Sequence, residues 1–443
     1  MTGRRDRGGR ERLGPPEEWL VFGFMAVIAL GTLLLALPVS AKAGRSIGVF
    51  DSLFTATSAV CVTGLVAVDT GTTFSTFGQA VLLVLIQVGG LGFMVFATML
   101  LVMLGKKLTL KGRMLIRESM NGATLTNLGG LTRLYLLLAL SIECAGAIPL
   151  AIRFVPMFGV KRGLWFALFH AVSAFCNAGF DLFGDYSSLT AFSGDPLVLA
   201  TVAALIVAGG LGFSVILEAL RNRQGFFGLS LHARIVLTST LALLISGMGF
   251  FMLAERMDPL NALFQSVTLR TAGFNAVDQA TLTDGSKLFG SLLMMVGASP
   301  ASTGGGMKTT TVAVVVLMII SVVRGGSEVN AARRRLSGDT VHRALAVTSL
   351  FLCMLTLGML AIVLLENGRY SMADILYECA SAMGTVGVSA IGTPNLQTAS
   401  RAVLLPMMFL GRVGPLTLAI AVARRQGRAR SASKYPEEKI MIG

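Results

Sequence analysis

The sequence is poor in charge, cysteine and histidine, and each shortage excludes a class of protein. Charged residues make up 14% of its 443 residues, whereas soluble domains carry about 25%. Hydrophobic residues make up 54%, more than a water-soluble core could bury. We therefore predict an integral membrane protein that crosses the bilayer several times.

The five cysteines show neither a disulfide framework nor the spacing of a zinc site. The three histidines, His170, His232 and His342, lie far apart, so they indicate no histidine cluster or catalytic triad. The stretch STGGGMK does not meet the spacing of a phosphate-binding loop. Because no nucleophile–base pair is evident either, we predict that the chain is not an enzyme and holds no organic cofactor.

Residues 19–38 form the first long apolar run, which could belong to a signal peptide or to a retained span. The run is too long for the apolar region of a signal peptide, and no clear cleavage site follows it. We therefore expect residues 19–38 to be the first membrane-spanning helix.

The net charge of +14 is distributed unevenly along the chain. Five segments hold 25 Lys and Arg residues against 9 acidic residues: 1–18, 105–133, 221–234, 324–343 and 424–443. Four segments between them hold 10 basic and 12 acidic residues: 39–73, 153–195, 255–287 and 366–401. This positive-inside pattern predicts a multi-pass protein of the plasma membrane with both termini in the cytoplasm. Its basic surface would face anionic lipid or a cytoplasmic partner, and we expect no nucleic acid to bind.

Four glycines recur in one local context: Gly64, Gly179, Gly273 and Gly387. Each follows a long apolar span and a short apolar segment, and each precedes a second long span. The short segments are 47–59, 162–175, 258–269 and 371–383. They are too short to cross an apolar core of roughly 30 Å, so we predict half-helices that re-enter the membrane. Extracellular loops with some helix are the alternative, which four matching copies disfavour.

The short segments also share the pattern Phe-x-x-x-Ser-Ala in whole or in part. The aromatic positions are Phe54, Phe169, Phe264 and Tyr377, and the serines four residues later are Ser58, Ser173 and Ser381. The unit is therefore a span, a half-helix, a glycine-bearing loop and a second span, present four times. Eight full crossings leave both termini on one side, as the charge distribution requires.

The glycine-bearing loops are the predicted functional site. Non-helical backbone at membrane depth is tolerated only where protein buries it or where it lines a watery cavity. Four such loops around one axis would offer carbonyl oxygens that replace the water shell of a monovalent cation. Glycine adopts the backbone angles that these loops need, and the C-terminal ends of the half-helices favour a cation. The candidate filter residues are Val62, Thr63, Gly64, Asn177, Ala178, Gly179, Thr271, Ala272, Gly273, Thr385, Val386 and Gly387.

The loop sequences TSAVCVTGL, SAFCNAGF, TLRTAGFN and SAMGTVGV resemble the filter loops of the Trk, Ktr and HKT superfamily of potassium transporters. The resemblance covers residues 19 to about 423 and is nearest to the Ktr membrane subunit. It implies a homodimer and regulation by a cytoplasmic nucleotide-binding ring of the RCK type. It also implies potassium as the ion at the filter carbonyls, with sodium as a second candidate because each loop keeps a single glycine.

The fold class implied is an all-α polytopic membrane protein. It has four covalently linked span–pore helix–filter loop–span repeats in a pseudo-fourfold arrangement similar to that of a potassium channel. The predicted repeats are 19–104, 131–221, 232–324 and 342–423. The predicted cytoplasmic segments are 1–18, 105–130, 222–231, 325–341 and 424–443.

The stretch MVGASPASTGGGMKTTT at 295–311 interrupts the second span of the third repeat. Its proline, glycines and hydroxyl residues break a helix at membrane depth, and discontinuous helices usually lie on the substrate path. We predict a gate loop at 297–308 on the cytoplasmic side of the filter, as in Ktr and Trk proteins; a packed kink is the alternative. The predicted gate residues are Gly297, Ser299, Pro300, Thr303, Gly304, Gly305, Gly306, Lys308 and Arg412.

Two arginines lie within predicted membrane segments. Arg412 is expected to bind carbonyl groups of the gate loop or a carboxylate, and to act as a positive barrier or latch. Arg270 is expected to lie behind the filter, where it would bind Asp278 or backbone carbonyls. We interpret Arg270 as a structural brace, with a permeation role as the alternative.

Two acidic residues and two glycine motifs complete the pattern. Glu218 is expected to pair with Arg221 one helical turn away, whereas Glu143 is either structural or a ligand of a coupling ion. The matching stretches 86–94 and 206–214, with GGLGF in common, are interpreted as sites of tight helix packing.

The leading interpretation is potassium uptake through a single-chain pore that a cytoplasmic partner regulates. One alternative is a pore of the same architecture that prefers sodium or ammonium. A second alternative is a membrane scaffold without transport, which would leave the four glycine loops unexplained.

Overall fold

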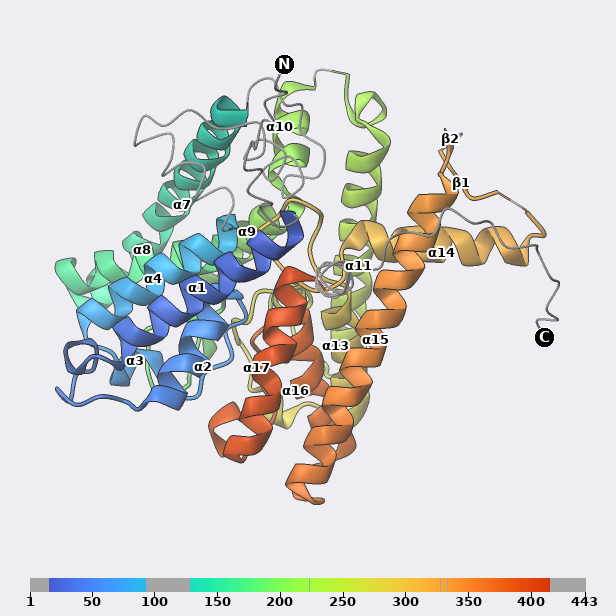
Figure 1. Cartoon of the computed structure of the whole chain (residues 1–443). Coiled ribbons are helices and arrows are strands. Elements are labelled where there is room, and N and C mark those ends of the chain that lie inside the picture. Colours follow the sequence, from blue (N-terminus) through green and yellow to red (C-terminus); the bar gives the residue numbers. More distant parts are fainter. Residues whose placement is uncertain (1–15, 93–127, 223, 327, 333, 415–443) are drawn as a thin grey trace, which may run out of the picture.

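The computed structural model describes residues 16–92, 128–222, 224–326, 328–332 and 334–414. The described chain is mostly helical (Figure 1). Its helices are α1 (Pro16–Ala36), α2 (Val49–Val60), α3 (Thr70–Thr73), α4 (Thr76–Leu91), α7 (Leu128–Phe158), α8 (Val160–Phe175), α9 (Pro196–Leu211), α10 (Phe213–Arg221), α11 (Leu231–Ala254), α12 (Pro259–Thr268), α13 (Asp284–Met295), α14 (Thr309–Val323), α15 (Gly338–Glu366), α16 (Met372–Gly384) and α17 (Thr398–Val413). An antiparallel hairpin of β1 (Asn330–Ala331) and β2 (Arg334–Arg335) follows α14. Short 3-10 turns lie at Pro38–Ser40, Thr190–Phe192, Phe226–Gly228, Gln279–Thr281 and Thr393–Asn395.

Capping side chains mark the start of the short helices α12 and α16, whereas α2 and α8 begin after Gly48 and Gly159. Asp258 accepts a hydrogen bond from the backbone N–H of Asn261 at the start of α12 (3.2 Å). Ser371 does the same for Asp374 at the start of α16 (3.1 Å). These side chains satisfy first-turn amides that have no helical partner. Pro259 suits the first position of α12, where no N–H is required.

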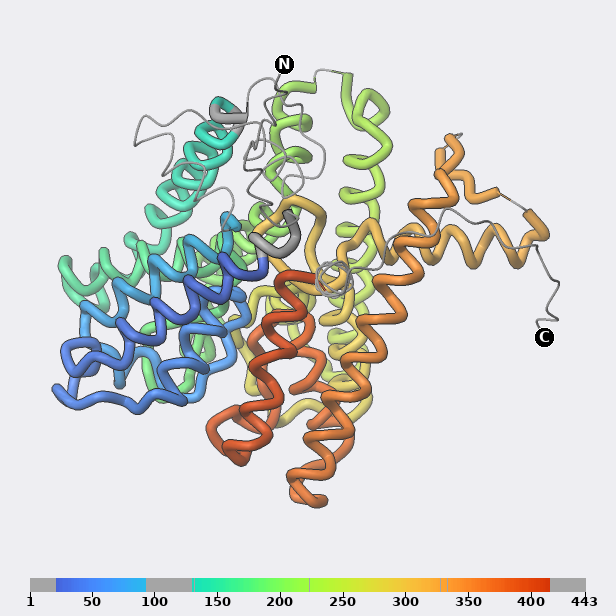
Figure 2. The backbone as a smooth tube through the Cα atoms, viewed as in Figure 1, coloured from blue at the N-terminus to red at the C-terminus, as the bar shows by residue number. Residues whose placement is uncertain are grey.

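Each repeat consists of an outer helix, a short helix and an inner helix. The sets are α1, α2 and α4; α7, α8 and α9–α10; α11, α12 and α13–α14; and α15, α16 and α17. The tube in Figure 2 shows these sets following one another along the chain. The four short helices lie within two residues of the predicted half-helices at each end.

The repeats pack in a closed cycle. The inner helix of each repeat contacts the short helix of the next: α4 on α8, α9 on α12, α13 on α16 and α17 on α2. The last of these contacts joins the fourth repeat to the first. The predicted pseudo-fourfold arrangement of four linked repeats is therefore confirmed.

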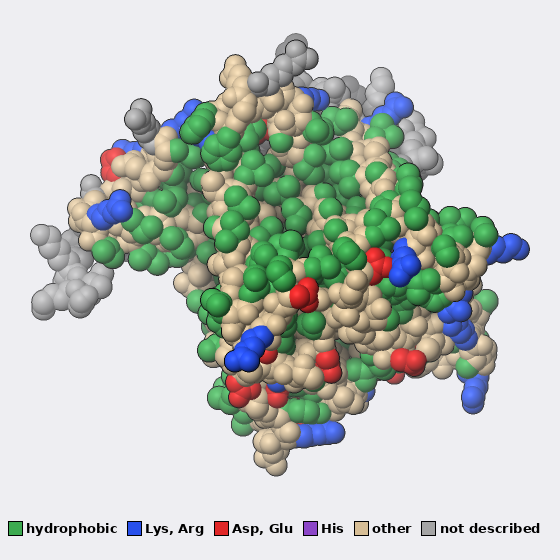
Figure 3. All heavy atoms as spheres, turned by 180° about the vertical axis from the view of Figure 1, so that it is seen from behind, with side chains coloured by type: hydrophobic (Ala, Val, Ile, Leu, Met, Phe, Trp, Pro, Cys, Tyr) green, Lys and Arg blue, Asp and Glu red, His purple; other side chains and the backbone are tan. Residues whose placement is uncertain are grey.

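Apolar side chains cover much of the outer surface. Leu33, Leu253 and Leu364 are 68%, 86% and 71% exposed, which suits contact with lipid. In Figure 3 hydrophobic side chains dominate the visible face, and acidic side chains gather mainly in its lower half. Among the described residues, α7, α11 and α15 are long and apolar enough to span a membrane, and the bent pair α9–α10 would make a fourth span.

The inner helices are broken in two repeats, whereas the sequence predicted a break only in the third repeat, between α13 and α14. The inner helix of the second repeat also bends, by 97° between α9 and α10. Gly212 makes the bend with a φ of 90°, which residues with a Cβ rarely adopt.

Candidate functional site

The four glycine-bearing loops share one backbone conformation. In each loop the glycine and the residue two positions before it have positive φ. Glycine adopts this conformation readily, but for the earlier, non-glycine residue it is strained, and such strain is concentrated at functional sites. The glycines are Gly64 (89°), Gly179 (71°), Gly273 (84°) and Gly387 (101°). The earlier residues are Val62 (54°), Asn177 (58°), Thr271 (69°) and Thr385 (53°).

The same glycines meet in a closed ring. A Cβ built on each glycine would collide with the carbonyl oxygen of the residue before the next repeat's glycine. These distances are 2.5 Å from Gly64 to Ala178, 2.7 Å from Gly179 to Ala272, 2.3 Å from Gly273 to Val386 and 2.1 Å from Gly387 to Thr63. The structure thus brings all four predicted loops to one place, and only glycine fits at the four contacts.

The end of each short helix holds its loop. The backbone N–H groups of Thr63, Ala178 and Val386 donate at 2.8 Å to the carbonyls of Ser58, Ser173 and Ser381, respectively. In the third repeat Thr268 takes the place of serine, and its hydroxyl donates to the carbonyl of Phe274 at 2.7 Å. The aromatic side chains four residues earlier are at most 1% exposed in all four repeats: Phe54, Phe169, Phe264 and Tyr377.

Residues 296–308, called here the intramembrane loop, connect α13 to α14 without a helix. The loop folds back on itself, and the N–H of Gly297 donates to the carbonyl of Met307 at 2.8 Å. Its glycines touch the filter loops closely. A Cβ on Gly304 would lie 2.2 Å from the Thr271 hydroxyl, and one on Gly305 would lie 2.3 Å from the Thr385 hydroxyl. The predicted helix break is present, and it lies directly against the glycine ring.

The intramembrane loop also caps neighbouring helices. The last turn of a helix leaves carbonyl groups without helical partners, and α9 and α17 both end beside this loop. Its backbone N–H groups supply the missing donors: Ser299 to Gly210 (3.0 Å), Thr303 to Gly209 (3.2 Å) and Gly306 to Gly411 (3.1 Å). The loop is therefore held by backbone hydrogen bonds to two other repeats.

A Gly-x-x-Gly motif ends three inner helices: Gly89–Gly92, Gly209–Gly212 and Gly411–Gly414. A Cβ on the first glycine of each motif would lie within 2.2 Å of a carbonyl at the end of the short helix, at Val60, Phe175 or Met383. The second glycines have φ values of 85°, 90° and 92°. The tight packing predicted for 86–94 is present at Gly89, with 93–94 outside the described residues, and that predicted for 206–214 is present at Gly209. The helix end at the second glycine was not predicted. In the third repeat the intramembrane loop takes the place of this motif.

Two cationic side chains bind carbonyl oxygens of the intramembrane loop. Arg412 donates to the carbonyls of Thr303 and Gly89, and to that of Gly90 at 3.0 Å. Lys308 donates to the carbonyl of Gly304 at 2.7 Å. The predicted carbonyl partners of Arg412 are therefore found. Arg412 also donates to the end of α4, so the intramembrane loop and Arg412 together supply donors to the last turns of α4, α9 and α17.

Comparison with known proteins identifies the family. The description "Cation transport protein" (TrkH) fits residues 19–227 and 235–432. The chain belongs to the TrkH family of cation transport proteins. The predicted resemblance to the Trk and Ktr transporters is thereby confirmed.

Family relatives match over nearly the full length. The chain is 40% identical to Ktr system potassium uptake protein B of Bacillus subtilis, with 100% of each chain covered. It is 36% identical to the potassium/sodium uptake protein NtpJ of Enterococcus hirae, with 98% of each covered. The crystal structure of the potassium transporter TrkH from Vibrio parahaemolyticus has the same fold, with a TM-score of 0.73 at 18% identity. That match covers 94% of this chain and 86% of the other.

Two predicted ion pairs are absent among the described residues of this TrkH-family fold. Arg270 does not bind Asp278, because that carboxylate accepts from the N–H of Ala280 (2.9 Å). Its guanidinium lies 3.5 Å from the carbonyl of Gly297, as the alternative prediction of a backbone carbonyl partner expected. Glu218 accepts hydrogen bonds from Ser230. No ion pair joins Glu218 to Arg221 among the described residues.

Glu143 lies close to the second filter loop. Its carboxylate is 2% exposed and accepts from the side-chain amide of Gln87 at 2.9 and 3.2 Å. The thiol of Cys176, the residue before Asn177, lies 3.9 Å from the same carboxylate. Gln87 was not singled out in the sequence, and only its position within an apolar span could have indicated it.

Ion pairs join repeats at the end where the short helices begin. Lys287 of α13 binds Asp374 of α16 at 2.7 Å, and Arg401 of α17 binds Asp51 of α2 at 3.1 Å. Burial raises the pKa of the Asp374 carboxyl, but hydrogen bonds from Lys287 and Ser371 outweigh it, so the pKa lies below its ordinary value. These pairs hold the third repeat to the fourth and the fourth to the first.

Proposed function

We propose that the chain takes up potassium ions through a pore formed by its four repeats. The observation that carries the proposal is the closed ring of Gly64, Gly179, Gly273 and Gly387. Relatives of full length and 40% and 38% identity are named as potassium uptake proteins, which supports the choice of ion. The ring would be the narrowest part of the path, with an ion bound by backbone oxygens.

The chemistry of the ring requires backbone rather than side chains. Ala178, Ala272 and Val386 carry no polar side-chain atom, so their carbonyls are the ligands they offer to a dehydrated cation. The C-terminal ends of α2, α8, α12 and α16 lie at the loops, where their partial negative charge favours a cation. The proposed filter residues are Val62, Thr63, Gly64, Asn177, Ala178, Gly179, Thr271, Ala272, Gly273, Thr385, Val386 and Gly387.

The intramembrane loop is proposed to be the gate. It presses its glycines against the hydroxyls of Thr271 and Thr385, so an ion that leaves the ring meets the loop next. Arg412 binds the carbonyl of Thr303 from another repeat and would hold the loop closed. Opening would require these contacts to break together.

Regulation is proposed to come from outside this chain. The sequence has no phosphate-binding loop, so a nucleotide signal would need a second, cytoplasmic subunit. The relatives named as parts of a "Ktr system" agree with a partner of this kind. We propose a homodimer in the plasma membrane, with both termini and the basic segments facing that partner.

Sodium is the second candidate ion, because one full-length relative is named as a potassium/sodium uptake protein. The decisive experiment reconstitutes the purified chain in vesicles and measures uptake of rubidium-86. We expect excess potassium to compete strongly and sodium weakly. Equal competition by sodium would favour the second candidate, and absence of any cation flux would contradict transport by this chain.

A further inference from the structure

Arg270 is a buried charge with too few partners. The residue is 8% exposed. Its terminal nitrogen lies 3.5 Å from the carbonyl of Gly297, and its Nε has no hydrogen-bond partner in the described structure. A buried charge is costly unless it is well hydrogen-bonded. The Nε–H group of Arg270 therefore requires an acceptor that the described residues do not supply.

The position of Arg270 differs from its counterparts in the other repeats. The residue immediately before the filter triplet is Cys61, Cys176 and Gly384 in repeats one, two and four. Only the third repeat carries a charge at this place, and only that repeat carries the intramembrane loop. The guanidinium reaches the first part of that loop, at Gly297. The two features that are specific to the third repeat, Arg270 and the intramembrane loop, are therefore in contact.

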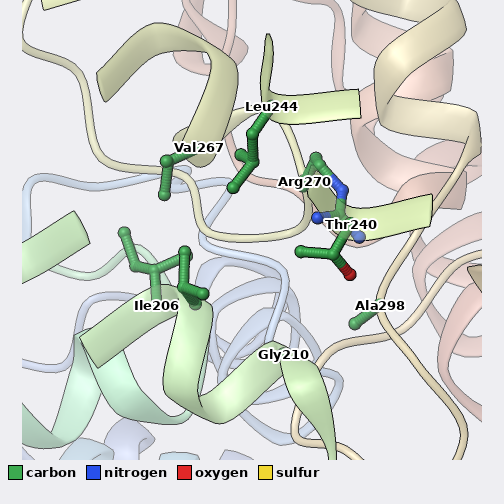
Figure 4. A pocket seen from close by; sticks show the side chains of 8 residues that line it. Ile206, Gly210, Thr240, Leu244, Val267, Arg270 and Ala298 are labelled. Atoms are coloured by element: carbon green, nitrogen blue, oxygen red, sulfur yellow. The ribbon is translucent and has the colours of Figure 1, made fainter. Parts of the chain in front are cut away.

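A small cavity lies beside the Arg270 side chain. It has a volume of about 10 Å³, about the room that one water molecule needs. The lining includes Gly210 of α9, Thr240 of α11 and Ala298 of the intramembrane loop. Figure 4 shows the side chains of Arg270 and Thr240 close together at this cavity. The Thr240 hydroxyl also has no partner in the described structure, so one water would satisfy both groups.

We propose that Arg270 is a positioning residue that couples the third filter loop to the intramembrane loop, with a water in this cavity completing its hydrogen bonds. The backbone of Arg270 is fixed by the bond from its N–H to the carbonyl of Val267 (3.1 Å). Withdrawal of Gly297 would remove the only protein acceptor that the guanidinium has in the described structure. The conformation of the third filter loop and that of the intramembrane loop therefore cannot change independently. This inference rests on the proposed function of the loop as a gate.

The two arginines act on the intramembrane loop from different sides. Arg412 reaches Thr303 from the fourth repeat, whereas Arg270 reaches Gly297 from within the filter region. Loss of Arg270 should therefore release the end of the loop next to α13, with the Arg412 contacts intact. The expected effect is a leak of ions through a loosened gate, without loss of the filter ring.

The test uses the purified full chain in vesicles with Arg270→Met, which keeps an unbranched stem and removes the charge, and Arg270→Lys, which keeps the charge. We expect Arg270→Met to raise passive rubidium flux about three- to tenfold, the range that coupling free energies of this kind produce. Arg270→Lys should give a smaller rise. Thr238→Val is the matched control, because Thr238 lies on the same helix α11 outside the cavity lining, and its exposed hydroxyl donates to the carbonyl of Arg234 (2.7 Å). It should leave the flux nearly unchanged.

A second arm repeats these measurements in a chain that lacks residues 299–306. There the gate is already disrupted, so Arg270→Met should add no further flux. The proposal is overturned if Arg270→Met leaves the flux of the full chain unchanged, if it adds the same increase without the loop, or if Thr238→Val raises the flux equally. If Arg270→Met does not fold, Arg270→Lys decides: flux equal to that of the unchanged chain overturns the proposal. An unchanged chain without cation flux contradicts the proposed function instead.

Discussion

At the scale of single residues, the molecule depends on glycines placed where a Cβ has no room. Gly387 shows this most clearly, because its φ is 101° and a Cβ would lie 2.1 Å from the carbonyl oxygen of Thr63. Two different penalties apply there: backbone strain and a collision with the neighbouring repeat. The sequence indicated this glycine through its fourfold recurrence. It could not indicate the collision, since Thr63 is more than 300 residues away.

Gly387→Ala should therefore reduce potassium uptake about tenfold or more. Overpacking of this kind costs about 1–3 kcal/mol, and a factor of ten corresponds to about 1.4 kcal/mol. The measurement is rubidium uptake in vesicles, normalised to the amount of folded protein. Gly48→Ala is the matched control, because Gly48 has a similar φ of 94° with no atom within 4 Å of a built Cβ. Equal losses in the two variants would mean that crowding in the ring is unimportant.

Arg412 is the residue whose partners were anticipated best. Arg412→Ala should raise potassium flux or loosen regulation, because the carbonyls of Thr303 and Gly89 lose their donor and the loop loses a contact to the fourth repeat. One buried hydrogen bond to a charged group contributes about 1.5–3 kcal/mol, so an increase of about tenfold is expected. Vesicle flux with and without the cytoplasmic partner measures both effects. Unchanged flux together with unchanged regulation would remove Arg412 from the gate.

At the scale of helices, the sequence predicted the short helices well and the ends of the inner helices poorly. The lengths of α2, α8, α12 and α16 follow from short apolar segments bounded by capping residues and glycines, all of which are local signals. The end of α9 at Gly212 does not follow from local signals alone. The pair Gly209–Gly210 packs tightly whether or not the helix continues, and the helix ends because the intramembrane loop supplies donors to its last carbonyls.

The start of α16 offers a test of how the short helices are anchored. Because the folded pKa of Asp374 lies below its ordinary value, the stabilisation is present above pH of about 4 and is lost as the pH falls through the folded pKa. Asp374→Asn should lower the melting temperature at pH 7 by a few degrees and weaken the loss of stability in acid. Thermal unfolding in detergent from pH 3 to 7 measures both. Asp284→Asn, in the exposed first turn of α13, is the control and should change neither.

At the scale of the whole molecule, the main feature is that the four repeats form a closed cycle. The contact of α17 with α2 and the ion pair between Arg401 and Asp51 join parts of the chain that are 350 residues apart. Periodicity alone indicated four units. Their cyclic order could not be derived from spacing, because a row of four repeats would have the same sequence pattern. The resemblance of the loops to a family of pores predicted the ring. The packing of each inner helix on the short helix of the next repeat confirms it.

The orientation of the whole molecule gives a further prediction. If the positive-inside pattern applies, a cysteine introduced at Ser46 should react with a membrane-impermeant maleimide on intact cells. A cysteine introduced at Gln224 should react only after permeabilisation, because the loop between α10 and α11 would face the cytoplasm. Both residues are exposed, and the chain with its natural cysteines provides the background. The reverse labelling pattern would invert the proposed topology.

The backbone bonds that tie residues 299, 303 and 306 to the ends of α9 and α17 have a consequence for the conducting state. If the loop moves away as the proposed gate, those helix carbonyls would lose their donors at membrane depth, where water is the one ready substitute. Conduction would thus begin with wetting of the space below the ring. The same three amide hydrogens should exchange slowly with deuterium at rest and quickly while ions flow, so isotope exchange could report the position of the barrier without any added probe.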